Sequence, residues 1–385
     1  MTRLASTRRL WTVARIFSGQ QTKVEGGTYE LYGANGVIGC TDQLQRGSVV
    51  LVGRVGSVGR VTVPVGQFGV SDNALVCAID TAQLDRRWVA YWLSTLDWGP
   101  QLTGTAQPLL TGRLLAEQCL PSTELAEQVR IADYLDTETA RIDRVMRANE
   151  RMRQLASERF AAWQASVVAP WVDPIETLDT TSHAAAKAPA GWAVTRLASV
   201  GDAATGKVTV EQLAELSEVT HWTIEELAQS GKPRLQPGAD IASDKLVVEG
   251  GELLVSRLNP RRGHVFRTFT SSQRSVASTE FFILKPRRLP LAWVWHSMRS
   301  VPVRAYLDAN VRSATRSQQR VEMAYIARTP VLVPPRPELD ARCRELEAEL
   351  QSFERLLAVS EAQDRLLMER QQALITAAVT GELEV

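Results

Sequence analysis

Hydrophobic residues recur with a 3-4 spacing along two long segments of the chain. The first segment runs from Glu127 to Trp163 and the second from Leu346 to Val379, and neither contains glycine or proline. This pattern predicts two long helices, each with an apolar stripe that requires a partner. Since each helix can serve as the partner of the other, the simplest arrangement is an antiparallel coiled coil.

Every seventh position defines the expected seam between these helices. In the second segment the two rows are Leu339, Leu346, Phe353, Ser360, Leu367 and Leu374, and Cys343, Leu350, Leu357, Asp364, Gln371 and Ala378. The first segment offers Leu135, Ile142, Asn149, Ala156 and Trp163, with Val145 and Met152 beside them. Polar seam residues such as Asn149 and Asp364 weaken a coiled coil but can fix its register, or they mark where a helix of another protein docks.

Outside the helices the pattern changes to short runs of β-branched residues separated by glycine. Such runs predict strands and tight turns, and they span Gly47–Val65, Asn73–Ile79, Gly251–Leu258 and Ser278–Pro286. Short amphipathic helices are expected at Arg86–Leu96 and Pro290–Val301, and a small-residue linker at His183–Gly191. The parts outside the long helices are therefore expected to be mixed α/β.

The chain also repeats itself. Trp11–Ile16 (WTVARI) resembles Trp192–Leu197 (WAVTRL) at an offset of 181 residues, and the run from Gly47 resembles the run from Gly251. The long helices correspond at an offset of 211, which pairs Leu135 with Leu346. Since the order is kept throughout, we interpret the chain as a duplication.

The predicted fold class is α+β, with two mixed α/β domains, two long helices in an antiparallel coiled coil, and a pseudo-two-fold internal repeat. The expected boundaries are residues 1–122 for the first domain, 123–180 for the central helix, 181–337 for the second domain and 338–385 for the last helix.

Composition is ordinary for a soluble globular protein, with 44% hydrophobic and 23% charged residues and a net charge of +1. No apolar run approaches the roughly 18 residues that span a bilayer, and the N-terminus has no signal-peptide pattern. The four scattered cysteines favour reduced thiols and a cytoplasmic location.

Charge is unevenly distributed along the chain: residues 250–320 hold 13 Lys/Arg and 3 Asp/Glu, whereas residues 338–370 hold 9 acidic and 5 basic residues. A basic segment beside an acidic helix suggests that one part faces an anion.

Motifs for catalysis are weak. Gly201–Thr209 (GDAATGKVT) nearly fits a phosphate-binding loop, but Val208 stands where a Mg-binding hydroxyl is needed. The four histidines are isolated, which argues against a metal site, and neither a methyltransferase pocket nor a nuclease cluster is recognisable. We therefore expect no catalytic residue and no bound metal.

The length of the predicted helices points to a different role. A helix of about 40 residues is about 60 Å long, comparable with two turns of DNA, so two similar domains could contact two segments of one duplex.

Two segments carry a specific resemblance. The run after Leu120-Pro121, EQVRIADYLDTETARID, and the closing LLMERQQALITAAVTGELEV resemble conserved regions of the specificity subunit of type I restriction-modification enzymes. The segments YELYGANGVIG, GSVVLVGRVGSVG and GELLVSRLNPRRGHV are also similar to that family, so the resemblance covers essentially the whole chain. Two features depart from the pattern: the first domain is shorter than the second, and the last helical region has ELDARCREL in place of the EQxxI motif.

The resemblance implies a function and a set of partners. Each domain would read one half of a bipartite, asymmetric sequence in double-stranded DNA, and the helical pair would space the halves. Two methyltransferase subunits would dock on the chain and supply S-adenosylmethionine. Restriction subunits would supply translocation and cleavage driven by ATP and Mg. The chain itself would be non-catalytic and bind no cofactor.

Sequence readout needs side chains with forked or paired hydrogen-bonding groups, and glycine-rich turns let backbone amides approach phosphate. The candidate DNA-binding residues are Asn35, Arg54, Ser57, Arg60, Asn73 and Gln107 in the first domain, and Arg257, Asn259, Arg261, Arg262, Arg312, Arg316, Gln318 and Arg320 in the second. The candidate spacer and subunit-docking residues are Leu135, Ile142, Asn149, Leu350, Leu357 and Leu367. Two alternatives remain at this point: a coiled-coil scaffold without DNA binding, and an NTPase that depends on the loop around Lys207.

Overall fold

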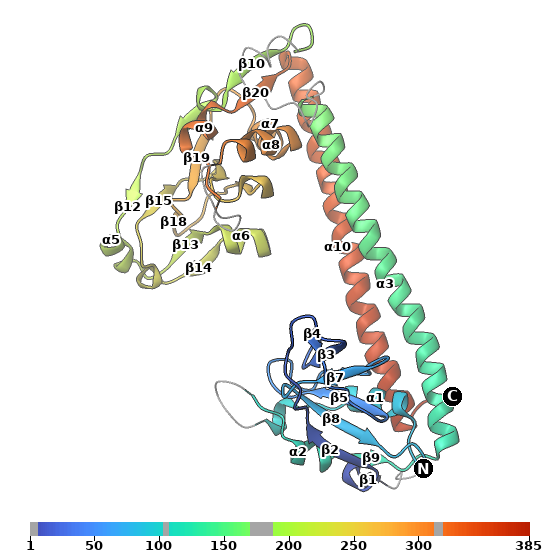
Figure 1. Cartoon of the computed structure of the whole chain (residues 1–385). Helices are drawn as coiled ribbons and strands as arrows, with labels where there is room; N and C mark the ends of the chain where they lie inside the picture. The colour runs from blue at the N-terminus through green and yellow to red at the C-terminus, as the bar shows by residue number, and fades with distance from the viewer. Residues whose placement is uncertain (1–6, 103–107, 170–187, 312–318) are drawn as a thin grey trace. The chain divides into compact units, whose positions relative to one another are not determined.

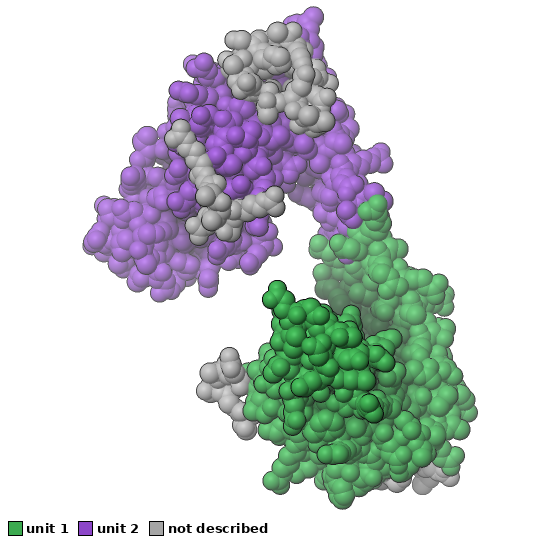
Figure 2. Space-filling model, viewed as in Figure 1, with its two compact units in different colours: residues 1–151, 360–385 green, residues 152–359 purple. Residues whose placement is uncertain are grey.

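A computed structural model describes residues 7–102, 108–169, 188–311 and 319–385 (Figure 1). The chain forms two compact units, residues 1–151 with 360–385 and residues 152–359 (Figure 2). Two helices contribute a segment to each unit: α3 (Leu125–Val168) and α10 (Arg336–Thr380). Most of the expected linker at residues 183–191 lies outside the described residues.

Unit 1 is built on a four-stranded antiparallel sheet in the order β2-β8-β5-β6. A three-stranded sheet, β4-β3-β7, contains the parallel pair β3 and β7, and β1 pairs with β9. The strands are β1 (Thr7–Arg9), β2 (Ala14–Ser18), β3 (Tyr29–Gly33), β4 (Gly36–Thr41), β5 (Val49–Gly53), β6 (Val61–Thr62), β7 (Phe68–Val70), β8 (Ala74–Ile79) and β9 (Cys119–Pro121). The short helices are η1 (Leu10–Thr12), α1 (Arg86–Ser94), η2 (Gly99–Gln101) and α2 (Gly112–Ala116).

The core of unit 1 includes the long helices as well as the domain. Trp88 and Leu93 of α1 pack in one buried cluster with Leu135 of α3 and Ile375 of α10. The helix α1 is capped by Asp85, whose carboxylate accepts hydrogen bonds from two backbone amides of the first turn. Because the cluster is continuous, the globular part and the helices of unit 1 fold as one body.

Unit 2 repeats this plan with additions. Its four-stranded antiparallel sheet has the order β11-β19-β16-β17, a five-stranded sheet has the order β12-β15-β18-β13-β14, and β10 pairs with β20. The strands are β10 (Ala193–Arg196), β11 (Gly201–Ala203), β12 (Lys207–Val208), β13 (Val219–Trp222), β14 (Arg234–Gln236), β15 (Lys245–Val248), β16 (Leu253–Ser256), β17 (Val265–Arg267), β18 (Arg274–Ala277), β19 (Phe281–Pro286) and β20 (Pro330–Val333). The helices are η3 (Leu197–Ser199), α5 (Val210–Ala214), α6 (Ile224–Ser230), η4 (Gly238–Asp240), η5 (Pro260–Arg262), α7 (Leu291–Arg299), α8 (Val301–Ala309) and α9 (Met323–Arg328).

The internal repeat is visible in strand order, but one part of its sequence alignment was wrong. The pair β1–β9 is followed by η1 at Leu10, and the pair β10–β20 is joined to η3 at Leu197. Leu10 therefore corresponds to Leu197, at an offset of 187 rather than 181. Trp11, which the sequence alignment matched with Trp192, is 62% exposed. The similarity of the two tryptophan motifs is thus displaced by six residues from the structural repeat.

The long helices pack against each other within each unit. In unit 1 the amide Nδ2 of Asn149 donates to Oδ1 of Asp364 at 2.7 Å, and Gln371 donates to Asp143 at 3.3 Å. In unit 2 the rings of Phe160 and Phe353 stack with centroids 4.7 Å apart. The beginning of α3 thus contacts the end of α10 in unit 1, and the reverse holds in unit 2, so the pair is antiparallel. The predicted fold class is confirmed.

Candidate nucleic-acid interface

In unit 1 three connecting segments meet: the β3–β4 turn, the β5–β6 loop and the β7–β8 turn. The backbone amide of Arg54 donates to the carbonyl of Asn73 at 2.9 Å. A Cβ atom on Gly53 would lie 2.9 Å from the carbonyl oxygen of Ala34 and 2.0 Å from that of Ser57, so only glycine allows this close approach. The packing of the backbone therefore gathers five of the predicted residues into one cluster: Asn35, Arg54, Ser57, Arg60 and Asn73.

These five residues differ in how freely they can reach a ligand. Asn35, Arg60 and Asn73 are exposed, whereas Arg54 is partly buried and donates through NH1 to Oγ of Ser18 at 3.0 Å. The loop itself is held by backbone hydrogen bonds, including Gly53 to Arg60 at 2.8 Å. The arrangement offers amide and guanidinium groups on a rigid support. Gln107 lies outside the described residues.

In unit 2 the equivalent loop after β16 has a more unusual backbone. Asn259 adopts a left-handed conformation with φ of 46°, and Gly263 follows η5 with φ of 64°. The amide of Asn259 donates to the carbonyl of Gln319 at 2.8 Å, and the amide of Val321 donates to the carbonyl of Arg257 at 3.0 Å. These bonds join the loop to the segment at Gln319, so four predicted residues come together: Arg257, Asn259, Arg261 and Arg320.

Part of the positive charge of this cluster is neutralised internally. Glu280 lies 3.0 Å from Arg320 and 3.9 Å from Arg257. Arg261 donates through NH1 to Oε1 of Gln319 at 3.2 Å and remains exposed, as does Arg262. Arg261 and Arg262 are therefore better placed to meet an external anion than Arg257. The predicted residues Arg312, Arg316 and Gln318 lie outside the described residues.

A cavity of about 440 Å³ beside this loop contains residues that sequence reasoning missed. Besides Asn259 and Arg262 of the loop, its lining includes His221 of β13, Lys245 of β15 and His264. Burial, followed by the charge of Lys245, lowers the pKa of His221 to about 4, and burial together with nearby arginines lowers the pKa of His264. A neutral imidazole carries one donor and one acceptor, which suits the edge of a base.

Two ring nitrogens in this cavity are conspicuous. Nε2 of His221 and Nδ1 of His264 are buried and have no hydrogen-bond partner within the described part of the chain. No sequence motif joins these histidines, because they are separated by 43 positions and by the whole of β14 and β15. The pairing of β13 and β15 with β18 brings His221 and Lys245 together, whereas His264 comes from the segment just before β17, which pairs with β16 in the other sheet.

Other sequence predictions can also be located. The phosphate-loop-like segment does not form a loop around an anion, since Lys207 and Val208 pair as β12 with β15 and Thr209 caps α5. Among the described residues there is no group of three or more His, Cys, Asp or Glu that could hold a metal. Within the same residues no helix is long and apolar enough to cross a membrane.

Of the six predicted spacer residues, Asn149 contacts Asp364 of the other helix, and Leu135 and Leu350 belong to buried clusters that contain residues of both α3 and α10. Leu135, Ile142 and Leu350 are buried, whereas Asn149, Leu357 and Leu367 are half-buried. A different set of apolar residues on these helices is exposed: Val145, Leu366 and Met368 in unit 1, and Leu155, Leu356 and Val359 in unit 2. The sequence had placed Val145 beside the seam, and none of the six was selected as a spacer or docking residue.

Comparison with known proteins identifies the fold but not a close relative. No family model matches the sequence, and no curated protein matches it. A chain from a solved structure described as the "structural basis underlying complex assembly and conformational transition of the type I R-M system" is similar with a TM-score of 0.69, at 16% identity over 98% of each chain.

Two further solved structures match over the full length with lower TM-scores. The type I restriction-modification S subunit from M. genitalium has a TM-score of 0.42 at 13% identity, covering 98% of this chain and 97% of that one. The HsdS subunit from Thermoanaerobacter tengcongensis has a TM-score of 0.46 at 16% identity, covering 100% of this chain and 98% of that one. The resemblance inferred from the sequence is confirmed at the level of the fold.

Proposed function

We propose that this chain, which has the fold of type I restriction-modification specificity subunits, recognises a bipartite, asymmetric sequence in double-stranded DNA. One globular part reads each half of the target. The observation that carries the proposal is the duplication: equivalent four-stranded sheets in the two units each support a loop cluster with amide and guanidinium side chains. Because the two clusters contain different residues, they would read different half-sites.

Reading of bases and anchoring on the backbone fall to different residues in this proposal. Asn35, Asn73 and Asn259 carry amides that can pair with a base edge, and the neutral His221 and His264 add further donors and acceptors. Arg60, Arg261 and Arg262 are exposed cations suited to phosphate or to guanine.

The two long helices would space the half-sites and dock methyltransferase subunits. The buried seam residues contribute to spacing, since they hold α3 and α10 together. Docking falls to the exposed apolar residues, because Val359 and Leu366 of α10 are 67% and 65% exposed. The methyltransferase subunits would bring S-adenosylmethionine, and separate restriction subunits would bring ATP and Mg. The chain itself would act without catalysis, in the cytoplasm.

Selection from a random DNA library tests this proposal. The chain, assembled with its methyltransferase subunits, should enrich DNA that contains two short constant blocks separated by a gap of constant length. A coiled-coil scaffold without DNA binding, the main alternative, would enrich nothing above the methyltransferase subunits alone. Enrichment of a single uninterrupted block would contradict the two-domain reading.

A further inference from the structure

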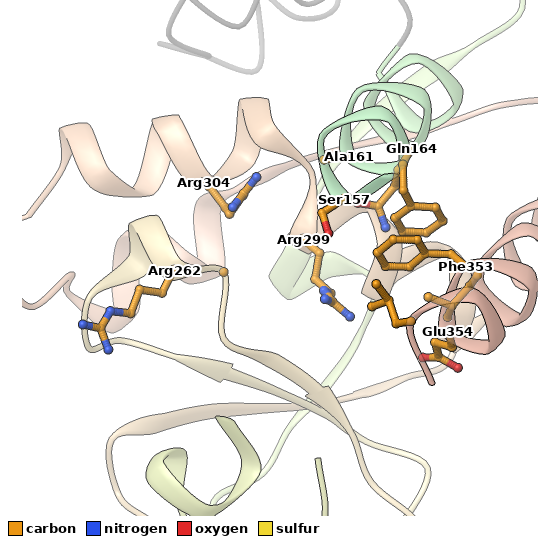
Figure 3. A pocket seen from close by; sticks show the side chains of 12 residues that line it. Ser157, Ala161, Gln164, Arg262, Arg299, Arg304, Phe353 and Glu354 are labelled. Carbon is orange, nitrogen blue, oxygen red and sulfur yellow. The ribbon is translucent and has the colours of Figure 1, made fainter. Parts of the chain in front are cut away.

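A second cavity lies entirely within unit 2, where the globular part meets the helices. It has a volume of about 410 Å³ and opens between η5, α7 and α8 on one side and α3 and α10 on the other (Figure 3). Three arginines line it: Arg262 of η5, Arg299 of α7 and Arg304 of α8. The opposite wall holds the stacked rings of Phe160 and Phe353 and a single carboxylate, Glu354.

The three guanidinium groups are only weakly compensated by the described part of the chain, in which Glu354 is a carboxylate that acts on Arg299. None of the three arginines forms an ion pair with a described residue, whereas Arg267 binds Glu347 at 2.7 Å. Nε of Arg304 is buried and has no hydrogen-bond partner among the described residues. Arg262 and Arg299 are exposed and Arg304 is partly buried, so their charges can be reached by a ligand from solvent. The cavity therefore carries an excess of positive charge that a bound anion would offset.

The arginines are also held in place. Arg299 lies over the ring of Trp295 at 4.2 Å, and Arg267 lies 4.4 Å from the same ring. Gly263, with φ of 64°, lets Arg304 approach the loop, since a Cβ atom at this position would lie 2.6 Å from Cδ of Arg304. A larger residue at position 263 would both strain the backbone and displace Arg304.

Electrostatics agree with this geometry. Desolvation by the surrounding protein, with the charges of Arg304 and Arg267 and against the effect of Glu354, lowers the pKa of Arg299 to about 10, and desolvation also lowers the pKa of Arg304. Both groups remain protonated at neutral pH, so their mutual repulsion persists in the free protein. An anion between them would relieve it.

We infer that this cavity is a phosphate-binding site formed by Arg299 and Arg304, and that its ligand is a phosphodiester of the DNA backbone. Guanidinium groups bind phosphate through paired hydrogen bonds, and both of these residues line the same volume, whereas the side chain of Arg262 points away from them (Figure 3). Arg262 also lines the histidine-containing cavity, so a phosphate held here would lie next to the residues proposed to read bases. The assignment of the ligand to DNA rests on the proposed function, whereas the binding of a phosphate group does not.

The first arm of the test uses inorganic phosphate and the full chain. Phosphate should raise the midpoint of thermal unfolding above that in chloride at equal ionic strength. Arg304→Gln should remove this difference, and Arg304→Lys should restore part of it. Arg288→Gln, which changes an exposed arginine of the same unit outside the cavity, should leave it unchanged. No phosphate-specific shift in the wild-type chain would argue against an anion site.

The second arm uses DNA and the chain assembled with its methyltransferase subunits. Arg304→Gln should weaken binding and reduce the slope of log affinity against log salt by about 0.9, the value for one lost phosphate contact, while Arg288→Gln should not. A phosphate shift without any change in this slope would overturn the assignment to DNA and leave a site for free phosphate. If the wild-type assembly bound no DNA, the proposed function would fail, yet the first arm would still report on the cavity.

Discussion

At the scale of single residues, equivalent positions tie each globular part to the helices with different chemistry. In unit 1 the hydroxyl of Tyr91 donates to Oδ1 of Asp136 at 2.7 Å. In unit 2 the equivalent contact joins Nε2 of His296 to Oε1 of Glu347 at 3.1 Å, and Nε2 of Gln164 donates to Nδ1 of His296 at 2.7 Å. The histidine is therefore held neutral with its proton on Nε2.

This contact makes the stability of unit 2 depend on pH. Burial lowers the pKa of His296 to about 4, against the opposing effect of Glu347 and with a smaller contribution from Arg267 and Arg299. Between pH 6.5 and 4 the unfolded chain binds a proton that the folded chain does not, so the free energy of unfolding falls as pH falls. The loss reaches at most about 1.4 kcal/mol per pH unit for one histidine.

Urea unfolding at pH 7 and pH 5 should therefore show a smaller loss of stability for His296→Gln than for the wild-type chain. His221, whose pKa is also lowered to about 4, stays in both proteins and contributes equally to each. Equal losses in the two proteins would show that His296 titrates normally in the folded state.

Arg261 and Arg262 provide a residue-scale prediction about DNA. Replacing both with alanine should weaken DNA binding by the assembled complex and flatten its salt dependence, because each lost phosphate contact removes nearly one released counterion. Salt titrations of binding measure both effects. Arg257→Ala is the comparison, since Arg257 faces Glu280 and should change the salt slope less. Unchanged affinity and slope in the double variant would remove these arginines from the interface.

At the scale of elements, the long helices were predictable because their pattern is periodic and local. The strands around Val49 and Leu253 were also predictable, since glycine marks their ends. The tryptophan repeat was misaligned because short motifs match by chance. The strand pairs β1–β9 and β10–β20 show instead that Leu10 and Leu197 occupy equivalent positions in the two repeats. The convergence of Arg299 and Arg304 on one cavity could not be predicted, because it depends on how α7 and α8 pack on the loop.

The helices offer a matched pair of substitutions. Leu135→Ala removes a fully buried side chain and should lower the free energy of unfolding by about 2–5 kcal/mol. Val145→Ala lies on the same helix at a position that is 38% exposed and should change it by less than about 0.5 kcal/mol. Chemical denaturation of the full chain compares the two. Similar losses would mean that the two sides of α3 are equally packed.

At the scale of the whole molecule, the proposal gives the helices the role of a spacer. Inserting seven residues after Asn149 in α3 and seven between Gln363 and Asp364 in α10 keeps the apolar seam roughly in phase. Each helix lengthens by about 10 Å, or about three base pairs of DNA. Methylation mapping should then show unchanged half-sites separated by a wider gap.

A control for this prediction is the insertion of two residues at the same positions, which rotates the seam by about 200° and should disrupt folding or assembly. If a double-heptad protein that assembles normally still modifies sites with the original gap, the helices do not set the spacing.

The central claim is that each globular part reads its own half of one DNA target. Its most direct test is methylation mapping in cells that carry the methyltransferase subunits with either this chain or a chimera in which residues 1–122 come from another specificity subunit. The account predicts a bipartite, asymmetric methylated sequence with a constant gap for this chain, and a change in only one half for the chimera. No chain-dependent methylation, or a change in both halves, would contradict it.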